Sequence, residues 1–314
     1  MKAPSEASRL AHDAIRMTPL SATGPTVSLV IGSGGIVCAA ALGVVKVLTE
    51  SGIHIDRVVG CGVGALFASM VALGHDTASA KDISVRTWTK ELASRPDRMG
   101  YLRLLAPKIC GFRADNFALR EDSALLERLR SVFGGKRIED THIPLHITAT
   151  DFATGELVEM TRGSIVDAIR ASMALPFAFS PVRLDGRLLV AGYLADPLPL
   201  SVAMKQGSGV IVGVGFQSAY QEDVRSARGF ALQFSAVLAN NLLKSKLAFH
   251  SMAHHSEVIV ILPEFKQRIG LFETVKIPYI VDQGEQAALQ QLPYLRELLA
   301  AERPRPAVAS SLPA

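Results

Sequence analysis

The chain has 314 residues, of which 49% are hydrophobic and 20% charged, and its net charge is +4. This balance is typical of a folded protein with a large core and argues against a disordered chain. No apolar run reaches the roughly 18–20 residues that span a bilayer, and residues 1–24 lack the apolar core of a secretory signal. The modest charge and the lack of a recognised motif argue against a nucleic-acid partner.

The cysteines Cys38, Cys61 and Cys110 are odd in number and lack metal-ligand spacing. They fit a reducing compartment and predict no metal site. We also expect no cofactor. The sequence therefore predicts a cytoplasmic protein, with peripheral contact at the inner membrane surface as an open alternative.

Two strand–helix units are predicted at the start of the chain. An apolar strand over residues 27–31 runs through the glycine-rich segment 32–35 into a helix over about 37–50. A second strand over 53–59 leads through residues 60–64 into a helix of small residues over 65–73. Successive units of this kind predict a parallel sheet with helices on its faces, hence an α/β fold.

Later apolar runs predict the remaining elements. The expected strands cover 145–150, 157–161, 187–191, 210–215 and 257–262, and a long helix is expected over 223–252. Residues 301–314 are rich in Pro, Ala and Ser and predict a disordered tail. We therefore expect a flexible arm at 1–24, one α/β domain at 25–300 and the tail at 301–314.

The segment 60–64 reads GCGVG. It has the layout of a nucleophile elbow, G-x-S-x-G, in which a sharp turn between a strand and a helix presents a serine for attack. Here Gly62 stands where that serine would be. Taken alone, a glycine-rich structural turn is the simpler interpretation.

With the downstream segments in view, residues 27–299 resemble the patatin-like phospholipase family. Three segments match scaffold motifs of that family: 149–156 (ATDFATGE), 168–176 (AIRASMALP) and 196–199 (DPLP). The resemblance implies a three-layer α/β/α sandwich with a mainly parallel central sheet. It also implies a lipid acyl hydrolase with a Ser-Asp dyad and a glycine-rich oxyanion loop.

The positions that would carry the chemistry depart from this pattern. The nucleophile corresponds to Gly62, the dyad aspartate to Ala191 and the oxyanion-loop arginine to Val37. Acyl transfer needs an activated nucleophile and a base, so the resemblance indicates a pseudoenzyme. Backbone N–H groups do not depend on side chains, so anion binding is still expected from a small set: Gly32, Ser33, Gly34, Gly35 and Val63.

Three functions stay open at this point. The favoured one is a catalytically inactive protein that binds a lipid or acyl-thioester ligand, or a partner protein or second copy of itself. The second is an acyl hydrolase, thioesterase or acyltransferase that uses a relocated thiol, Cys61 or Cys38, against the simpler interpretation that both are buried core residues. The third is an interaction protein whose cleft is closed, with Tyr193 filling the vacated site.

Residues 86–113 interleave basic and apolar side chains. Such a segment is typical of a cap helix with a solvated basic face and a buried apolar face, but it is also suited to an anionic membrane surface. Both interpretations stay open from the sequence.

Overall fold

The computed structural model describes residues 25–89, 95–218, 220, 224–252, 257–270 and 272–301. The predicted arm at 1–24 and residues 302–314 of the predicted tail lie outside this range. Ala301 is the last residue of a helix, so the tail was predicted to begin one residue too early.

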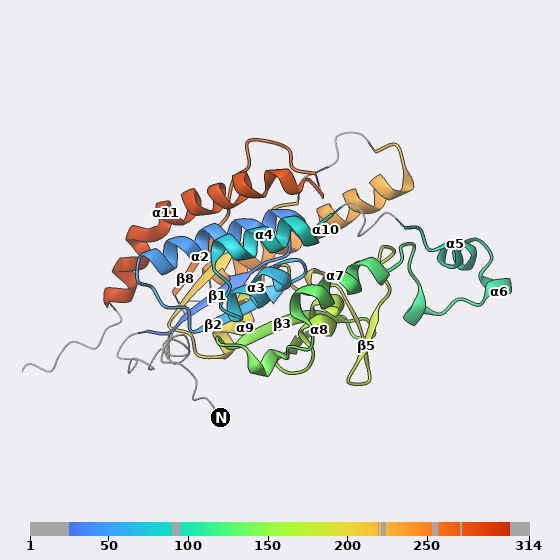
Figure 1. The fold of residues 1–314 in the computed structure, drawn as a ribbon, viewed down its shortest axis with the longest axis horizontal. Coiled ribbons are helices and arrows are strands. Elements are labelled where there is room, and N and C mark those ends of the chain that lie inside the picture. Colours follow the sequence, from blue (N-terminus) through green and yellow to red (C-terminus); the bar gives the residue numbers. More distant parts are fainter. Residues whose placement is uncertain are drawn as a thin grey trace, which may run out of the picture.

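An eight-stranded sheet forms the middle layer of the protein (Figure 1). Seven strands follow the order β5-β6-β3-β2-β1-β7-β8, and β4 pairs with β3. The central pairings are parallel, whereas those of β4, β5 and β6 are antiparallel. The strands are β1 Val27–Ile31, β2 Arg57–Cys61, β3 Leu145–Asp151, β4 Leu157–Met160, β5 Val182–Leu184, β6 Arg187–Val190, β7 Val210–Val214 and β8 Glu257–Ile261.

Helices cover both faces of this sheet. Side chains alternate along a strand, so Leu29 and Ile31 of β1 join one core cluster while Val30 joins another with Leu198 and Leu243. The predicted α/β sandwich with a mainly parallel sheet is confirmed. The helices are α2 Ala40–Glu50, α3 Gly64–Ala72, α4 Thr77–Thr87, α5 Arg98–Leu105, α6 Pro107–Cys110, α7 Ser123–Phe133, α8 Ile165–Ser172, α9 Leu200–Lys205, α10 Ala227–Met252 and α11 Ile277–Ala301, and the short 3-10 turns include η1 Gly35–Ala39 and η5 Gly192–Leu194.

The structure differs from the predicted elements in three places. Strand β2 begins at Arg57, because the preceding Asp56 is held by β1: its N–H donates to the Val27 carbonyl (2.8 Å) and its carboxylate accepts from the Val27 N–H (2.7 Å). The described part of the long helix begins at Ala227, and Asp223 lies outside the described residues. The third difference is a set of elements that were not predicted: strand β5 and the helices α4, α7, α9 and α11.

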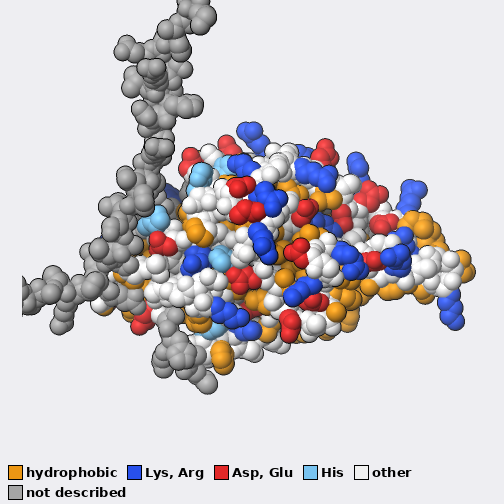
Figure 2. Space-filling model, turned by 90° about the horizontal axis from the view of Figure 1, so that it is seen from below, with side chains coloured by type: hydrophobic (Ala, Val, Ile, Leu, Met, Phe, Trp, Pro, Cys, Tyr) orange, Lys and Arg blue, Asp and Glu red, His pale blue; other side chains and the backbone are white. Residues whose placement is uncertain are grey.

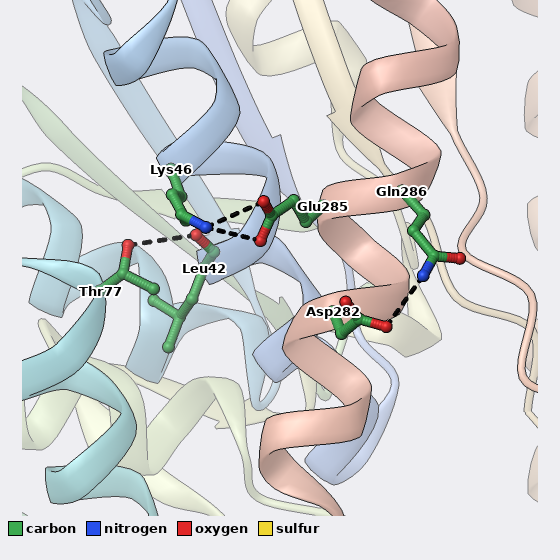
Figure 3. A network of polar contacts seen from close by, with 6 residues as sticks. All are labelled: Leu42, Lys46, Thr77, Asp282, Glu285 and Gln286. Carbon is green, nitrogen blue, oxygen red and sulfur yellow. Dashed lines mark hydrogen bonds and ion pairs between the residues drawn. The ribbon is translucent and has the colours of Figure 1, made fainter.

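Helix α11 packs directly on α2. A Cβ on Gly43 would lie 2.5 Å from the Glu285 nitrogen, and one on Gly284 would overlap the Ala40 carbonyl. The two glycines therefore let the helix backbones approach each other. Lys46 extends from α2 to Glu285, with Nζ–O distances of 2.8 and 2.9 Å (Figure 3). Among the described helices, none has both the length and the hydropathy needed to cross a bilayer.

Gly43→Ala should destabilise the protein by about 1–2 kcal/mol, because an overpacking cost of up to about 3 kcal/mol outweighs the roughly 1 kcal/mol gain in helix propensity. Urea unfolding followed by circular dichroism measures the effect. Gly135→Ala is the control, since a Cβ there meets nothing within 4 Å. Equal stability of the two variants would show that the α2–α11 contact can relax.

Candidate functional site

The predicted elbow is present between β2 and α3. β2 ends at Cys61, α3 begins at Gly64, and Gly62 turns the chain with φ +59°. Its N–H donates to the Ser172 hydroxyl (2.7 Å), which donates in turn to the Thr148 carbonyl (2.6 Å). Because Ser172 is fully buried, its hydroxyl serves to hold the elbow against α8 and β3.

Ser33 lies where a side chain on residue 62 would project. A Cβ built on Gly62 would lie 3.0 Å from the Ser33 Cβ and overlap the Ser33 Oγ. The glycine-rich loop therefore places a hydroxyl in the space beside the elbow. The sequence pointed to Ser33 as an anion-binding residue and did not reveal this contact, which joins two loops far apart in the chain.

The glycine-rich loop offers fewer free donors than predicted. The Gly32 N–H donates to the Val214 carbonyl and the Ser33 N–H to the Pro197 carbonyl, each at 2.9 Å. The Gly34 N–H lies near the Cys38 sulfur, where burial raises the pKa of the thiol and this N–H lowers it in part. Two of the five predicted anion-binding N–H groups are thus already paired with protein carbonyls.

Phe216 closes one side of this loop. A Cβ on Gly34 would lie 2.5 Å from the Phe216 Cβ, so the ring packs directly on the loop backbone. Gly35 follows with φ +69° and starts η1. The N–H groups of Gly35 and Val63 have no hydrogen-bond acceptor among the described residues, and they remain as donors toward an anion.

The segment around Ala191 lies against the elbow. A Cβ on Gly192 would lie 3.0 Å from the Cys61 sulfur and 2.5 Å from the Thr148 carbonyl. Thr150 secures the segment by donating to the Ala191 carbonyl (2.9 Å) and accepting from the Ala195 N–H (3.1 Å). The fold thus brings together the three segments that the resemblance assigned to nucleophile, base and oxyanion loop.

A family model matches the part of the chain that contains these three segments. The model of the patatin-like phospholipase family matches residues 29–204. The chain belongs to the patatin-like phospholipase family. An uncharacterised NTE family protein of Mycobacterium tuberculosis is 32% identical over 205 residues, covering 65% of this chain and 53% of that protein.

Patatin-like phospholipase domain-containing protein 6 of Homo sapiens is 28% identical over 204 residues, covering 64% of this chain and 14% of that protein. The chain thus spans about half the length of the mycobacterial relative. The crystal structure of VipD from Legionella pneumophila aligns with a TM-score of 0.47 at 15% identity, covering 89% of this chain and 67% of that one.

Val37 is the residue that the resemblance aligns with the oxyanion-loop arginine of patatin-like proteins. It is half-buried in η1 and packs against the main core cluster. An apolar side chain in this packed position provides no positive charge beside the loop.

Both candidate thiols are buried. Cys38 and Cys61 have no exposed surface, and their sulfurs donate to the Gly32 and Asp196 carbonyls, each at 3.3 Å. Burial raises the pKa of Cys61 to about 12 and that of Cys38 well above its ordinary range. The structure therefore argues against a cysteine nucleophile, because the thiolate is the reactive form.

Helix α10 is attached to residues 191–196, which we call the dyad segment because the resemblance places the dyad aspartate at Ala191. The Tyr193 hydroxyl pairs with Ser235, and burial raises the pKa of Tyr193. Lys246 Nζ lies 3.5 Å from the buried Asp196 carboxylate. The sequence did not single out Lys246, whose partner is 50 residues earlier in the chain.

A third contact holds the same helix. Asn240 is buried on α10, and its amide donates to the Ser218 carbonyl (2.9 Å) and accepts from the Ser218 N–H (2.8 Å). Two surface hollows of about 280 and 380 Å³ lie away from this helix: the first is between α2, α4 and α11, and the second is beside residues 138–146. Among the described residues, no cluster of His, Cys, Asp and Glu could hold a metal.

Gly62→Ser should lose about 1–3 kcal/mol of stability from the positive φ and a further amount from overlap with Ser33. Adding Ser33→Gly should restore the second part only. Gly52→Ser is the control for backbone conformation, since its φ is +71° and a Cβ meets nothing within 4 Å. Equal losses for Gly62→Ser and Gly52→Ser in urea unfolding would contradict the steric contribution of Ser33.

Asp196 should make stability depend on pH. Burial raises its pKa from 3.8 to about 6, so native Asp196 holds its proton more tightly than the unfolded chain does. Its contribution is fully present below the unfolded pKa and is lost as pH rises through about 6. Between pH 4 and pH 7, the free energy of unfolding of the wild type should fall by up to about 3 kcal/mol relative to that of Asp196→Asn. If the two proteins instead show the same change of unfolding free energy with pH, Lys246 fully compensates the buried charge.

Proposed function

We propose that this patatin-like protein binds an acyl or lipid ligand without hydrolysing it. The observation that carries the proposal is the arrangement at the elbow, where Gly62 offers no nucleophile and the Ser33 hydroxyl takes the adjacent space. Ala191 stands in the former base position, so the described site holds neither member of a Ser-Asp dyad.

Ser33 does not replace the missing serine in this proposal. Its oxygen is a weak nucleophile unless a base withdraws the proton, and the base position is occupied by Ala191. The buried Asp196 carboxylate is directed to Lys246 on α10, and the two neighbouring thiols are held protonated by burial.

The ligand is proposed from the donors that remain. The N–H groups of Gly35 and Val63, together with the Ser33 hydroxyl, suit a carbonyl, carboxylate or phosphate oxygen. Gly35 also begins the helical segment that continues into α2, whose N-terminal end favours negative charge. A fatty acyl thioester or a phospholipid supplies such groups next to an apolar chain.

A second function is favoured by a separate observation. Tyr193, Asp196 and Ser218 each form a contact with α10, which therefore lies fixed over the dyad segment. An interaction protein with a closed cleft would use the outer surface of the fold, with a partner protein or a second copy as its ligand.

Hydrolysis of p-nitrophenyl esters and acyl-CoA should be absent in the wild type, with or without iodoacetamide. The matched variant is Ser33→Gly/Gly62→Ser/Ala191→Asp, which restores a nucleophile, the space around it and a base. Turnover by the triple variant alone would locate the loss at these three positions. Wild-type turnover that alkylation abolishes would overturn the proposal in favour of a cysteine enzyme.

Calorimetric titration with palmitoyl-CoA separates the two non-catalytic functions. We expect saturable binding by the wild type and weaker binding by Ser33→Ala, which removes one donor. If no heat of binding is seen with the folded wild type, the closed cleft becomes the better explanation.

A further inference from the structure

Helices α5 and α6 extend beyond the layered body of the protein (Figure 1). They carry apolar side chains into solvent. Leu105 is 80% exposed and Ile109 is 87% exposed, and Phe112 beside them is 51% exposed. We call these three residues the apolar tip. The buried apolar face expected of a cap helix is thus wrong for this part of the chain.

The predicted basic segment 86–113 divides into two parts. Its first part belongs to α4, where Trp88 is buried and its ring lies 6.0 Å from that of Phe272. Residues 90–94 lie outside the described residues. The exposed apolar and basic character is therefore concentrated in α5, α6 and the residues directly after them.

This projection is held in place by several contacts. The Asp97 carboxylate caps α5 by accepting from the Met99 and Gly100 N–H groups at 2.9 and 3.1 Å. Gly100 is buried against the Ala118 carbonyl, where a Cβ would overlap it. The tip is thus presented by a defined local fold.

An aromatic series connects the tip to the body. The rings of Phe112 and Phe117 lie 5.0 Å apart, and that of Phe177 lies 6.1 Å from Phe117. Phe177 has φ +66°, a conformation that costs about 1–3 kcal/mol in a non-glycine residue, yet its ring is 57% exposed. Such strain persists only when the surrounding structure imposes it, which fits a surface selected for contact.

Positive charge surrounds the apolar tip (Figure 2). Residues 95–113 contain five cations and one carboxylate, Asp97. Arg98 and Lys108 are exposed and have no ion-pair partner among the described residues, whereas Arg113 is paired with Asp115 at 2.9 Å. The cations around the tip are therefore only partly neutralised.

We infer that the apolar tip and its cations bind an anionic lipid bilayer. Exposed Leu, Ile and Phe side chains suit the boundary between headgroups and acyl chains, and Lys and Arg suit anionic headgroups. A second copy of the chain is a poorer partner, because its tip would bring the same positive charge. The inference does not depend on whether the chain hydrolyses esters.

Co-sedimentation of the full chain with vesicles tests this surface. Binding is expected to vesicles of equimolar phosphatidylcholine and phosphatidylglycerol, to weaken with added salt, and to be much lower on phosphatidylcholine alone. Leu105→Ser/Ile109→Ser should weaken binding at least about tenfold. Arg98→Gln/Lys108→Gln should weaken it about twenty- to thirtyfold, from roughly fivefold per cation.

Matched controls lie elsewhere on the surface. Val275→Ser removes an apolar side chain that is 90% exposed, and Lys205→Gln/Arg296→Gln removes two exposed cations. Both should leave vesicle binding unchanged. All variants should unfold at the wild-type temperature, since the changed side chains are exposed.

Leu105→Trp reports insertion directly, because the wild-type chain has a single tryptophan, the buried Trp88. Its emission should shift to the blue with anionic vesicles and be quenched by brominated lipid. Vesicle binding that the tip variants do not change would overturn the inference. So would self-association of the wild type in ultracentrifugation that Leu105→Ser/Ile109→Ser abolishes in the absence of vesicle binding.

Discussion

The hydrogen bond from the Gly62 N–H to the Ser172 hydroxyl connects the parts on which the site depends. The Ser172 hydroxyl also donates to the Thr148 carbonyl. The elbow, α8 and β3 are therefore joined through one fully buried oxygen. An unpaired N–H in that position would be costly, which ties the elbow turn to the end of α8. The turn is therefore maintained by the scaffold and does not need a catalytic side chain.

Ser33 occupies the space that a side chain on residue 62 would need. A Cβ on Gly62 would overlap the Ser33 hydroxyl, which comes from the neighbouring glycine-rich loop. The glycine also accepts the φ of +59° without the cost that a serine would bear. Gly62→Ser alone would therefore meet two obstacles, the positive φ of residue 62 and the overlap with Ser33.

The elbow and the projection formed by α5 and α6 have different surroundings. At the elbow, the described groups are almost all paired: the Gly32 and Ser33 N–H groups with carbonyls, and the thiols with the carbonyls of other segments. At α5 and α6, by contrast, apolar and cationic side chains face solvent with few protein partners. The structure thus combines an elbow whose polar groups are largely paired with a projection whose apolar and cationic side chains face solvent.

The sequence by itself determined the α/β class, most of the strands and the elbow turn, because apolar runs and glycine-rich turns are local signals. It also shows valine at 37, glycine at 62 and alanine at 191, the positions that the resemblance aligns with the functional residues of the family, since residue identity needs no coordinates. Strand β5 was missed because three residues carry little pattern. Helix α11 does carry apolar residues at helical spacing, but Pro293 interrupts the pattern.

Only the tertiary structure decided how the site is filled and closed. Ser33 and Gly62 are separated by three elements in sequence, η1, α2 and β2, and the attachment of α10 through Tyr193 and Lys246 spans still longer distances along the chain. The burial of both thiols and the exposure of Leu105 likewise depend on what packs against them. Such contacts arise from the meeting of segments remote in the chain, and no local pattern encodes which side chain will meet which.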